Sequence, residues 1–235
     1  MKNWICMAMC LLLVLIAGSA QAATLSVTGS ATVTAEPDQA LVRLGVQETE
    51  TDVTKAQAQV NEKINAILDA LEKDETYPIA SADITTASYD IYPRYNYDDT
   101  TGEQELSGYR AECMLAIVVR DIEQVGKVID AAFAAGANEM DSIQFRLEDS
   151  SLVNDQVLTQ ALEDALHKAQ LLAQAAGIDL ADCEMNISTS ENTYVESGRN
   201  VMYAVADTKA VGATTVRAGQ LEFTASVSLT YSDKK

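Results

Sequence analysis

The stretch from Tyr89 to Arg110 reads YDIYPRYNYDDTTGEQELSGYR, and it decides how the middle of the chain folds. It holds five of the nine tyrosines, on either side of an acidic break that contains Gly102. Tyrosine is a strong strand former, and glycine suits a turn. A stacking platform for bases would need basic residues between the rings, and only Arg94 and Arg110 are present. The stretch therefore predicts a long antiparallel hairpin.

Alternation along the hairpin assigns the faces of its two strands. In the run from Ile84 to Tyr97, one face carries most of the tyrosines and the opposite face carries Tyr92. The returning run, Leu106 to Arg120, places Tyr109 on its apolar face. These rings offer more surface than one core needs. We therefore predict contacts with a second copy or another partner through Tyr92, Tyr95, Tyr97 and Tyr109.

The patterns on both sides of the hairpin predict an α+β fold. Period-two runs predict strands near 25–33, 40–48, 142–148, 183–189 and 221–231, and apolar spacings of three and four predict helices near 52–73, 121–136 and 151–177. The order is ββαββαβαββ. We expect a mainly antiparallel sheet with helices packed on one face, and residues 40–148 have the split βαβ, or ferredoxin-like, order.

Two further segments carry specific expectations. The longest helix should begin at a Ser151 cap and bury one apolar stripe, formed by Val157, Leu158, Ala161, Leu162, Ala165, Leu166 and Ala169. The polar stretch 190–217 has little periodicity. Loops of this length in a compact domain are typically mobile or functional.

The first 22 residues have the pattern of a secretory signal peptide. Lys2 precedes the uncharged run from Ile5 to Ala17, and Ala20-Gln21-Ala22 predicts cleavage after Ala22. The apolar run is shorter than the ~20 residues that span a bilayer. We therefore predict an exported chain, residues 23–235, without a stable membrane span after cleavage.

The charge balance excludes one class of partner. The chain has 16 Lys+Arg against 35 Asp+Glu, a net charge of −19. A phosphate backbone would be repelled, so nucleic acid is not an expected partner.

Several separated motifs resemble the SIMPL-domain family, exported bacterial proteins that include periplasmic immunogenic and oxidative stress defence proteins. They are the Pro93-x-Tyr95-x-Tyr97 run, the Gly108-Tyr109 pair, the Ala135–Asn138 turn before Ile143-x-Phe145, and the first and last strands, Val27–Val33 and Gly219–Val227. The resemblance covers residues 23–235. It implies a periplasmic location, a link to oxidative stress and, for some members, ring-like oligomers, but no assigned catalytic residue.

Signatures of enzyme chemistry are missing from the sequence. His167 is the single histidine, and no nucleophile motif, phosphate loop or Cys-x-x-Cys accompanies it. We predict no catalytic residue, no cofactor and no metal site, and a protein that is not an enzyme. The acidic hairpin turn, with Asp98, Asp99, Glu103 and Glu105, lacks the spacing of a calcium loop and is interpreted as a solvated tip.

Cys113 and Cys183 remain after removal of the signal peptide. Both lie on the apolar parity of their strands, so they could form a disulfide if those strands are neighbours. If the strands are not neighbours, both are buried free thiols.

These observations favour a non-enzymatic protein that acts through self-assembly, as a homo-oligomer, or through an unknown partner. Two alternatives stay open. One is a periplasmic module whose 190–217 loop closes over a ligand or peptide, and the other is a thiol-redox protein that uses Cys113 and Cys183.

Overall fold

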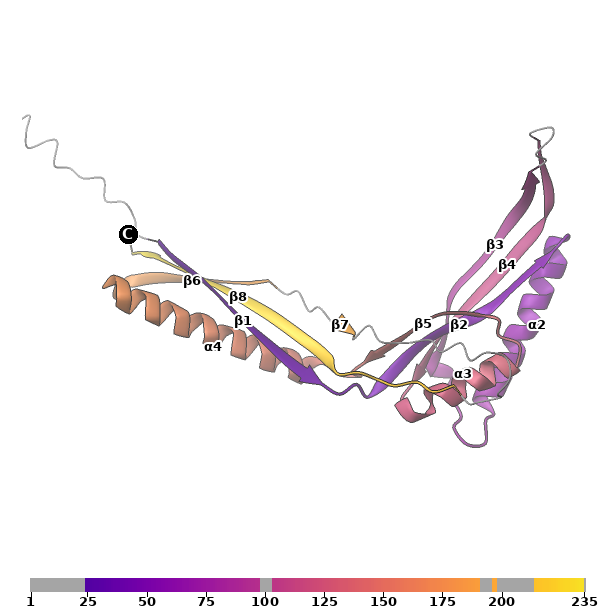
Figure 1. Ribbon diagram of the computed structural model, residues 1–235, viewed down its shortest axis with the longest axis horizontal. Coiled ribbons are helices and arrows are strands. Elements are labelled where there is room, and N and C mark those ends of the chain that lie inside the picture. The colour runs from indigo at the N-terminus through magenta and orange to yellow at the C-terminus, as the bar shows by residue number, and fades with distance from the viewer. Residues whose placement is uncertain (1–23, 98–102, 191–195, 198–213, 235) are drawn as a thin grey trace, which may run out of the picture. The chain divides into compact units, whose positions relative to one another are not determined.

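The structure is a computed structural model that describes residues 24–97, 103–190, 196–197 and 214–234 (Figure 1). The chain forms two compact units, which are considered separately. The α4 unit comprises residues 1–32, 155–193 and 224–235. The split-βαβ unit comprises residues 33–154 and 194–223.

The described elements confirm the α+β class with antiparallel strands. In chain order they are β1 (Thr24–Ala35), β2 (Gln39–Glu50), α2 (Val53–Glu72), β3 (Ile84–Tyr97), β4 (Gln104–Val119), α3 (Val125–Ala134), β5 (Glu139–Arg146), α4 (Ser151–Ala176), β6 (Cys183–Ser190), β7 (Glu196–Ser197) and β8 (Leu221–Asp233). Short 3-10 turns precede β3, α3 and β6. The strands form two sheets, whereas the sequence patterns predicted a single sheet.

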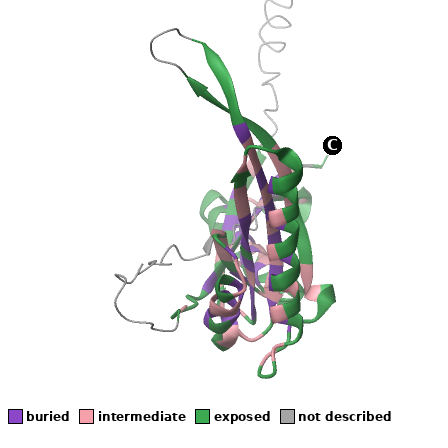
Figure 2. Ribbon diagram, turned by 90° about the vertical axis from the view of Figure 1, so that its right-hand side faces the viewer, coloured by how far each residue is buried: buried purple, intermediate pink, exposed green. Residues whose placement is uncertain are grey.

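The split-βαβ unit is built on the sheet β3-β4-β2-β5, whose neighbouring strands are all antiparallel. This is the split βαβ arrangement. Helix α2 covers one face, and a layer of buried apolar residues lies on α2, β2 and β4, where Figure 2 colours stretches of the ribbon as buried. They are Ala40, Val42, Leu44 and Val46 of β2, Ala111, Cys113, Leu115, Ile117 and Val119 of β4, and Ala56, Val60, Ile64, Ile67 and Leu71 of α2.

The start of α2 agrees with the sequence prediction. The Asp52 carboxylate accepts hydrogen bonds from the backbone N–H groups of Thr54 at 2.9 Å and Lys55 at 3.1 Å. These groups have no partner within the helix, so the cap fixes the residue at which β2 gives way to α2.

The α4 unit contains the sheet order β1-β8-β6. Its polar face carries a ladder of hydroxyl pairs between β1 and β8: Ser26 with Thr230, Thr28 with Ser228, and Thr32 with Thr224. Helix α4 also satisfies free backbone groups of β1. Asp164 accepts from the N–H of Ser30 at 2.9 Å, and Lys168 donates to the carbonyl of Thr28 at 3.2 Å. Side chains of α4 therefore protect this edge strand against pairing with another chain.

The buried stripe of α4 differs from the prediction. The buried residues are Val157, Ala161, Ala165, Ala169 and Ala173, while Leu158, Leu162 and Leu166 are half-buried. Gly29 of β1 gives the reason. A Cβ at Gly29 would lie 2.2 Å from the Ala161 carbonyl oxygen and 2.2 Å from the Ala165 nitrogen. Because the backbones approach so closely, only alanines fit at the contact. Ser151 is also the first helical residue and not the cap, since its N–H donates to the Asp149 carboxylate at 2.8 Å.

We expect Gly29→Ala to lower the free energy of unfolding by about 1–3 kcal/mol, because the added methyl group must displace helix backbone. Urea unfolding followed by circular dichroism measures this change. Gly219→Ala is the matched control, because a Cβ there would have no neighbour within 4 Å. If the two variants are equally stable, α4 does not approach β1 as described.

Candidate functional site: the tyrosine arm

The β3–β4 hairpin extends further than its neighbour β2. Pairing between β2 and β4 stops at Glu50 opposite Tyr109, whereas β3 and β4 continue to pair as far as Tyr97 opposite Gln104. We call residues 93–97 and 104–108 the arm. The predicted hairpin is confirmed, and Figure 2 shows the arm projecting beyond the helix and the rest of the sheet.

Gly108 lies where the arm leaves the sheet. Its φ is 155°, and a Cβ there would lie 2.5 Å from the Glu50 carbonyl oxygen. Because glycine has no side chain, the end of β2 can lie directly against β4 at this position as the chain turns toward α2.

The helix-facing side of the arm is aromatic and exposed. At the base of the hairpin, the Tyr89 hydroxyl donates to the side-chain Oδ1 of Asn61 in α2 at 3.1 Å. The side of the ribbon that carries Tyr89 is therefore the side that faces the helix. Further out, Tyr95 opposes Leu106 and Tyr97 opposes Gln104. The exposed fractions are 56% for Tyr95, 62% for Tyr97 and 50% for Leu106. No described element covers these side chains, so they contribute little buried apolar area to the described fold.

The other predicted contact residues are placed differently. Tyr92 is exposed on the opposite side of the ribbon, where it pairs with Arg110. Tyr109 is half-buried at the level where β2 ends. The structure thus brings Tyr95 and Tyr97 together and separates Tyr92 from them.

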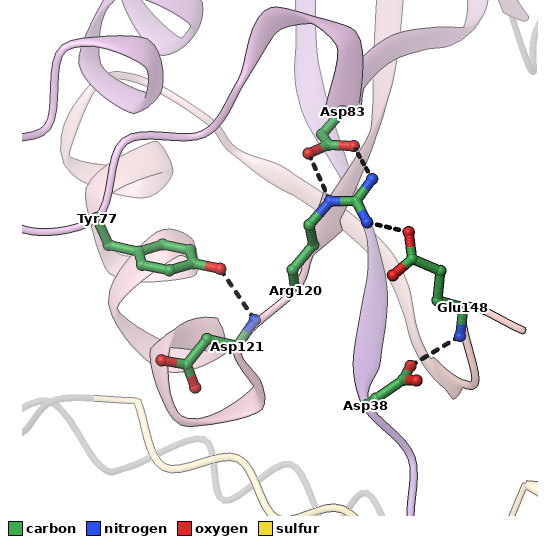
Figure 3. Close-up of polar contacts among 6 residues, drawn as sticks. All are labelled: Asp38, Tyr77, Asp83, Arg120, Asp121 and Glu148. Carbon is green, nitrogen blue, oxygen red and sulfur yellow. Dashed lines mark hydrogen bonds and ion pairs between the residues drawn. The ribbon is translucent and has the colours of Figure 1, made fainter.

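A polar cluster around Arg120 holds the opposite end of the sheet (Figure 3). The guanidinium donates to both carboxylate oxygens of Asp83, at 3.0 and 2.9 Å, and to Glu148. The Glu148 N–H in turn donates to the Asp38 carboxylate at 2.8 Å. Hydrogen bonds from Arg120 hold the pKa of Asp83 below its usual value, and Asp83 and then Glu148 raise the pKa of Arg120.

This cluster ties together the segments before β2 and β3, the end of β4 and the segment after β5. The Arg120 charge is paired with Asp83 and Glu148, the Asp38 carboxylate accepts from a backbone N–H, and these four residues include no hydroxyl or thiol nucleophile. Sequence reasoning missed it because its members are far apart in the chain. We interpret it as a structural clasp.

Comparison with known proteins gives a match to the SIMPL family model, described as a protein of unknown function (DUF541), over residues 25–231. The chain belongs to the SIMPL family. A 163-residue stretch is 32% identical to the 26 kDa periplasmic immunogenic protein of Brucella abortus (strain S19), covering 68% of this chain and 64% of that protein. A 146-residue stretch is 31% identical to the uncharacterized protein YggE of Escherichia coli (strain K12), covering 62% and 57%. The matches thus span less than two thirds of each relative.

The Ala135–Asn138 turn, one of the SIMPL motifs, has a clear structural role. The Asn138 side chain accepts from the Gln47 N–H and donates to the Gln47 carbonyl, both at 2.8 Å. Just before β5 begins, the Asn138 side-chain amide thus makes the two hydrogen bonds to β2 that the backbone of a neighbouring strand would make. This interaction explains why an asparagine follows the turn.

Cys113 and Cys183 of this SIMPL-family chain are free thiols in the structure. Cys113 is in β4 and Cys183 is in β6, and these strands belong to different sheets. The condition for a bridge, neighbouring strands, is therefore not met. Cys113 is 3% exposed, and burial raises the pKa of its thiol, which disfavours a reactive thiolate. The disulfide remains a prediction that the structure does not support.

Three other features singled out in the sequence are His167, the acidic hairpin tip and the expected lack of a membrane span. His167 is exposed on α4. Asp98 and Asp99 of the hairpin tip lie outside the described residues, and within those residues no group of three or more His, Cys, Asp or Glu could hold a metal ion. In the described part of the chain, no helix is both long and apolar enough to cross a membrane.

The 190–217 segment lies mostly outside the described residues. Its described end is fixed on α3, because the N–H and hydroxyl of Thr214 donate to the Asp130 carboxylate at 3.0 and 2.5 Å. Residues 196–197 form β7, which pairs with β8. The sequence pattern predicted neither contact.

We predict that a thiol reagent modifies Cys183 rapidly in the native mature protein and leaves Cys113 unmodified until the chain unfolds. Peptide mass mapping before and after denaturation measures both sites without a reductant. If neither cysteine reacts in unfolded protein until a reductant is added, the two are bridged and the free-thiol description is incorrect.

Proposed function

We propose that this is an exported, periplasmic protein that acts by self-association through the arm and not by catalysis. The observation that carries the proposal is the uncovered aromatic side of the arm. A two-stranded ribbon is marginally stable by itself, and large apolar side chains that face solvent together are typical of interaction sites. A second copy that covers Tyr95, Tyr97 and Leu106 would supply the missing apolar contacts.

Charge supports the arm as the place of contact. Two chains that each carry a net charge of −19 repel each other over most of their surface. The helix-facing side of the arm presents Tyr95, Tyr97, Leu106 and Gln104, which are uncharged. Approach through this surface therefore costs less electrostatic energy than approach through an acidic one.

The periplasmic location is supported by two observations. Residues 1–22 have the pattern of a signal peptide, and the Brucella relative is named a periplasmic protein. The association with oxidative stress defence comes from the family resemblance alone. The names of these two relatives state no enzymatic activity.

We expect the mature protein to form oligomers that dissociate when Tyr95, Tyr97 and Leu106 are all replaced by serine. Size-exclusion chromatography with light scattering measures the mass of each species over a range of concentrations. Added salt should strengthen the association of the wild-type chain, because it screens the repulsion between acidic copies.

Leu152→Ser provides the control, since Leu152 of α4 is 79% exposed and lies outside the arm. It should leave the measured mass unchanged. A wild-type chain that stays monomeric at every concentration contradicts the proposal, and so does a triple variant that associates as the wild type does.

A further inference from the structure

The side of the ribbon opposite the tyrosine surface contains a small hollow between two arginines. On this side Tyr92 opposes Arg110, and Arg94 opposes Gly108. Because Gly108 has no side chain, the place beside Arg94 is left open. The resulting hollow has a volume of about 250 Å³ and is lined by Tyr92, Pro93, Arg94 and Arg110.

Neither arginine forms an ion pair with an acidic side chain among the described residues. Ion pairs among the described residues use Lys63, Lys73, Arg120 and Lys168, and none uses Arg94 or Arg110. The Arg110 Nε is also buried without a hydrogen-bond acceptor. Buried unpaired donors in native structures call for a missing partner.

The neighbouring residues restrict the kind of anion. Asp90 and Glu112 oppose each other on the same side, one pair closer to the centre of the sheet. The charge of Asp90, then burial and a hydrogen bond to Asp90, and last the charge of Glu112, raise the pKa of Tyr92, so its phenol is engaged with Asp90 at the edge of the hollow. This negative pair disfavours a dianion such as phosphate. A planar carboxylate carries one charge and matches the two-pronged donor geometry of a guanidinium.

We propose that Arg94 and Arg110, with Tyr92 beside them, form a binding site for a carboxylate group. The site is on the side of the ribbon away from Tyr95 and Tyr97, so it does not depend on the self-association proposed above. A small organic acid and an acidic side chain of another protein chain share this chemistry, and the test below separates these two sources.

The test follows the Arg110 Nε–Hε signal in NMR spectra of ¹⁵N-labelled mature protein, assigned by its loss in Arg110→Lys. Sodium acetate should shift this signal to saturation, whereas sodium chloride at equal ionic strength should not. Arg94→Gln should weaken acetate binding by about tenfold or more, because it removes one charged hydrogen-bonding partner. Arg43→Gln is the matched control, since Arg43 is an exposed arginine in β2 that does not line the hollow.

A blocked tri-glutamate peptide serves as a second ligand. Tighter binding of the peptide than of acetate indicates a protein carboxylate, and equal or weaker binding indicates a small acid; both results support the site. The proposal is overturned if acetate and chloride act alike, if Arg94→Gln binds acetate as the wild type does, or if inorganic phosphate saturates the signal while acetate does not.

Discussion

The difference in length between β2 and the β3–β4 hairpin determines what the rest of the split-βαβ unit can do. β2 stops pairing at Glu50, because the Asp52 cap begins α2 within the next few residues. Helix α2 therefore covers the part of the sheet in which β2 pairs with β4, where Tyr89 still reaches Asn61. Between Tyr109 and the hairpin tip, no third strand or helix among the described residues accompanies the ribbon. Tyr95 and Tyr97 are thus in the same hairpin as buried core residues of β4, but their side chains are exposed on the protein surface.

Local signals in the sequence were sufficient for the elements themselves. The Asp52 cap, the hairpin and the end of α4 at Gly177, where the Ile178 N–H donates to the Ala173 carbonyl at 2.9 Å, all depend on neighbouring residues. For the same reason, alternation placed Tyr92 correctly on the side opposite Tyr95. The exposure of tyrosines on the arm could be anticipated because they exceeded what one core can bury, whereas their use as a contact surface stays a prediction.

Features that depend on distant partners could not be predicted. The leucines of α4 are half-buried because Gly29, far away in the chain, allows close contact only to alanines. The Arg120 clasp joins residues from four segments, and no periodicity marks it. Alternation along the strand correctly predicted that Cys113 lies on a buried, apolar side. It contained no information about which strands share a sheet, so it could not show that Cys113 and Cys183 are in different sheets. The hollow beside Arg94 required the pairing register, which only the folded hairpin fixes.

The central claim is that a second copy covers the arm. Hydrogen exchange followed by mass spectrometry, performed at low and high protein concentration, tests it most directly. The account predicts that amide protection in residues 93–97 and 104–108 rises with concentration, while β8 in the α4 unit exchanges equally in both samples. Equal exchange of the arm in the two samples would contradict it.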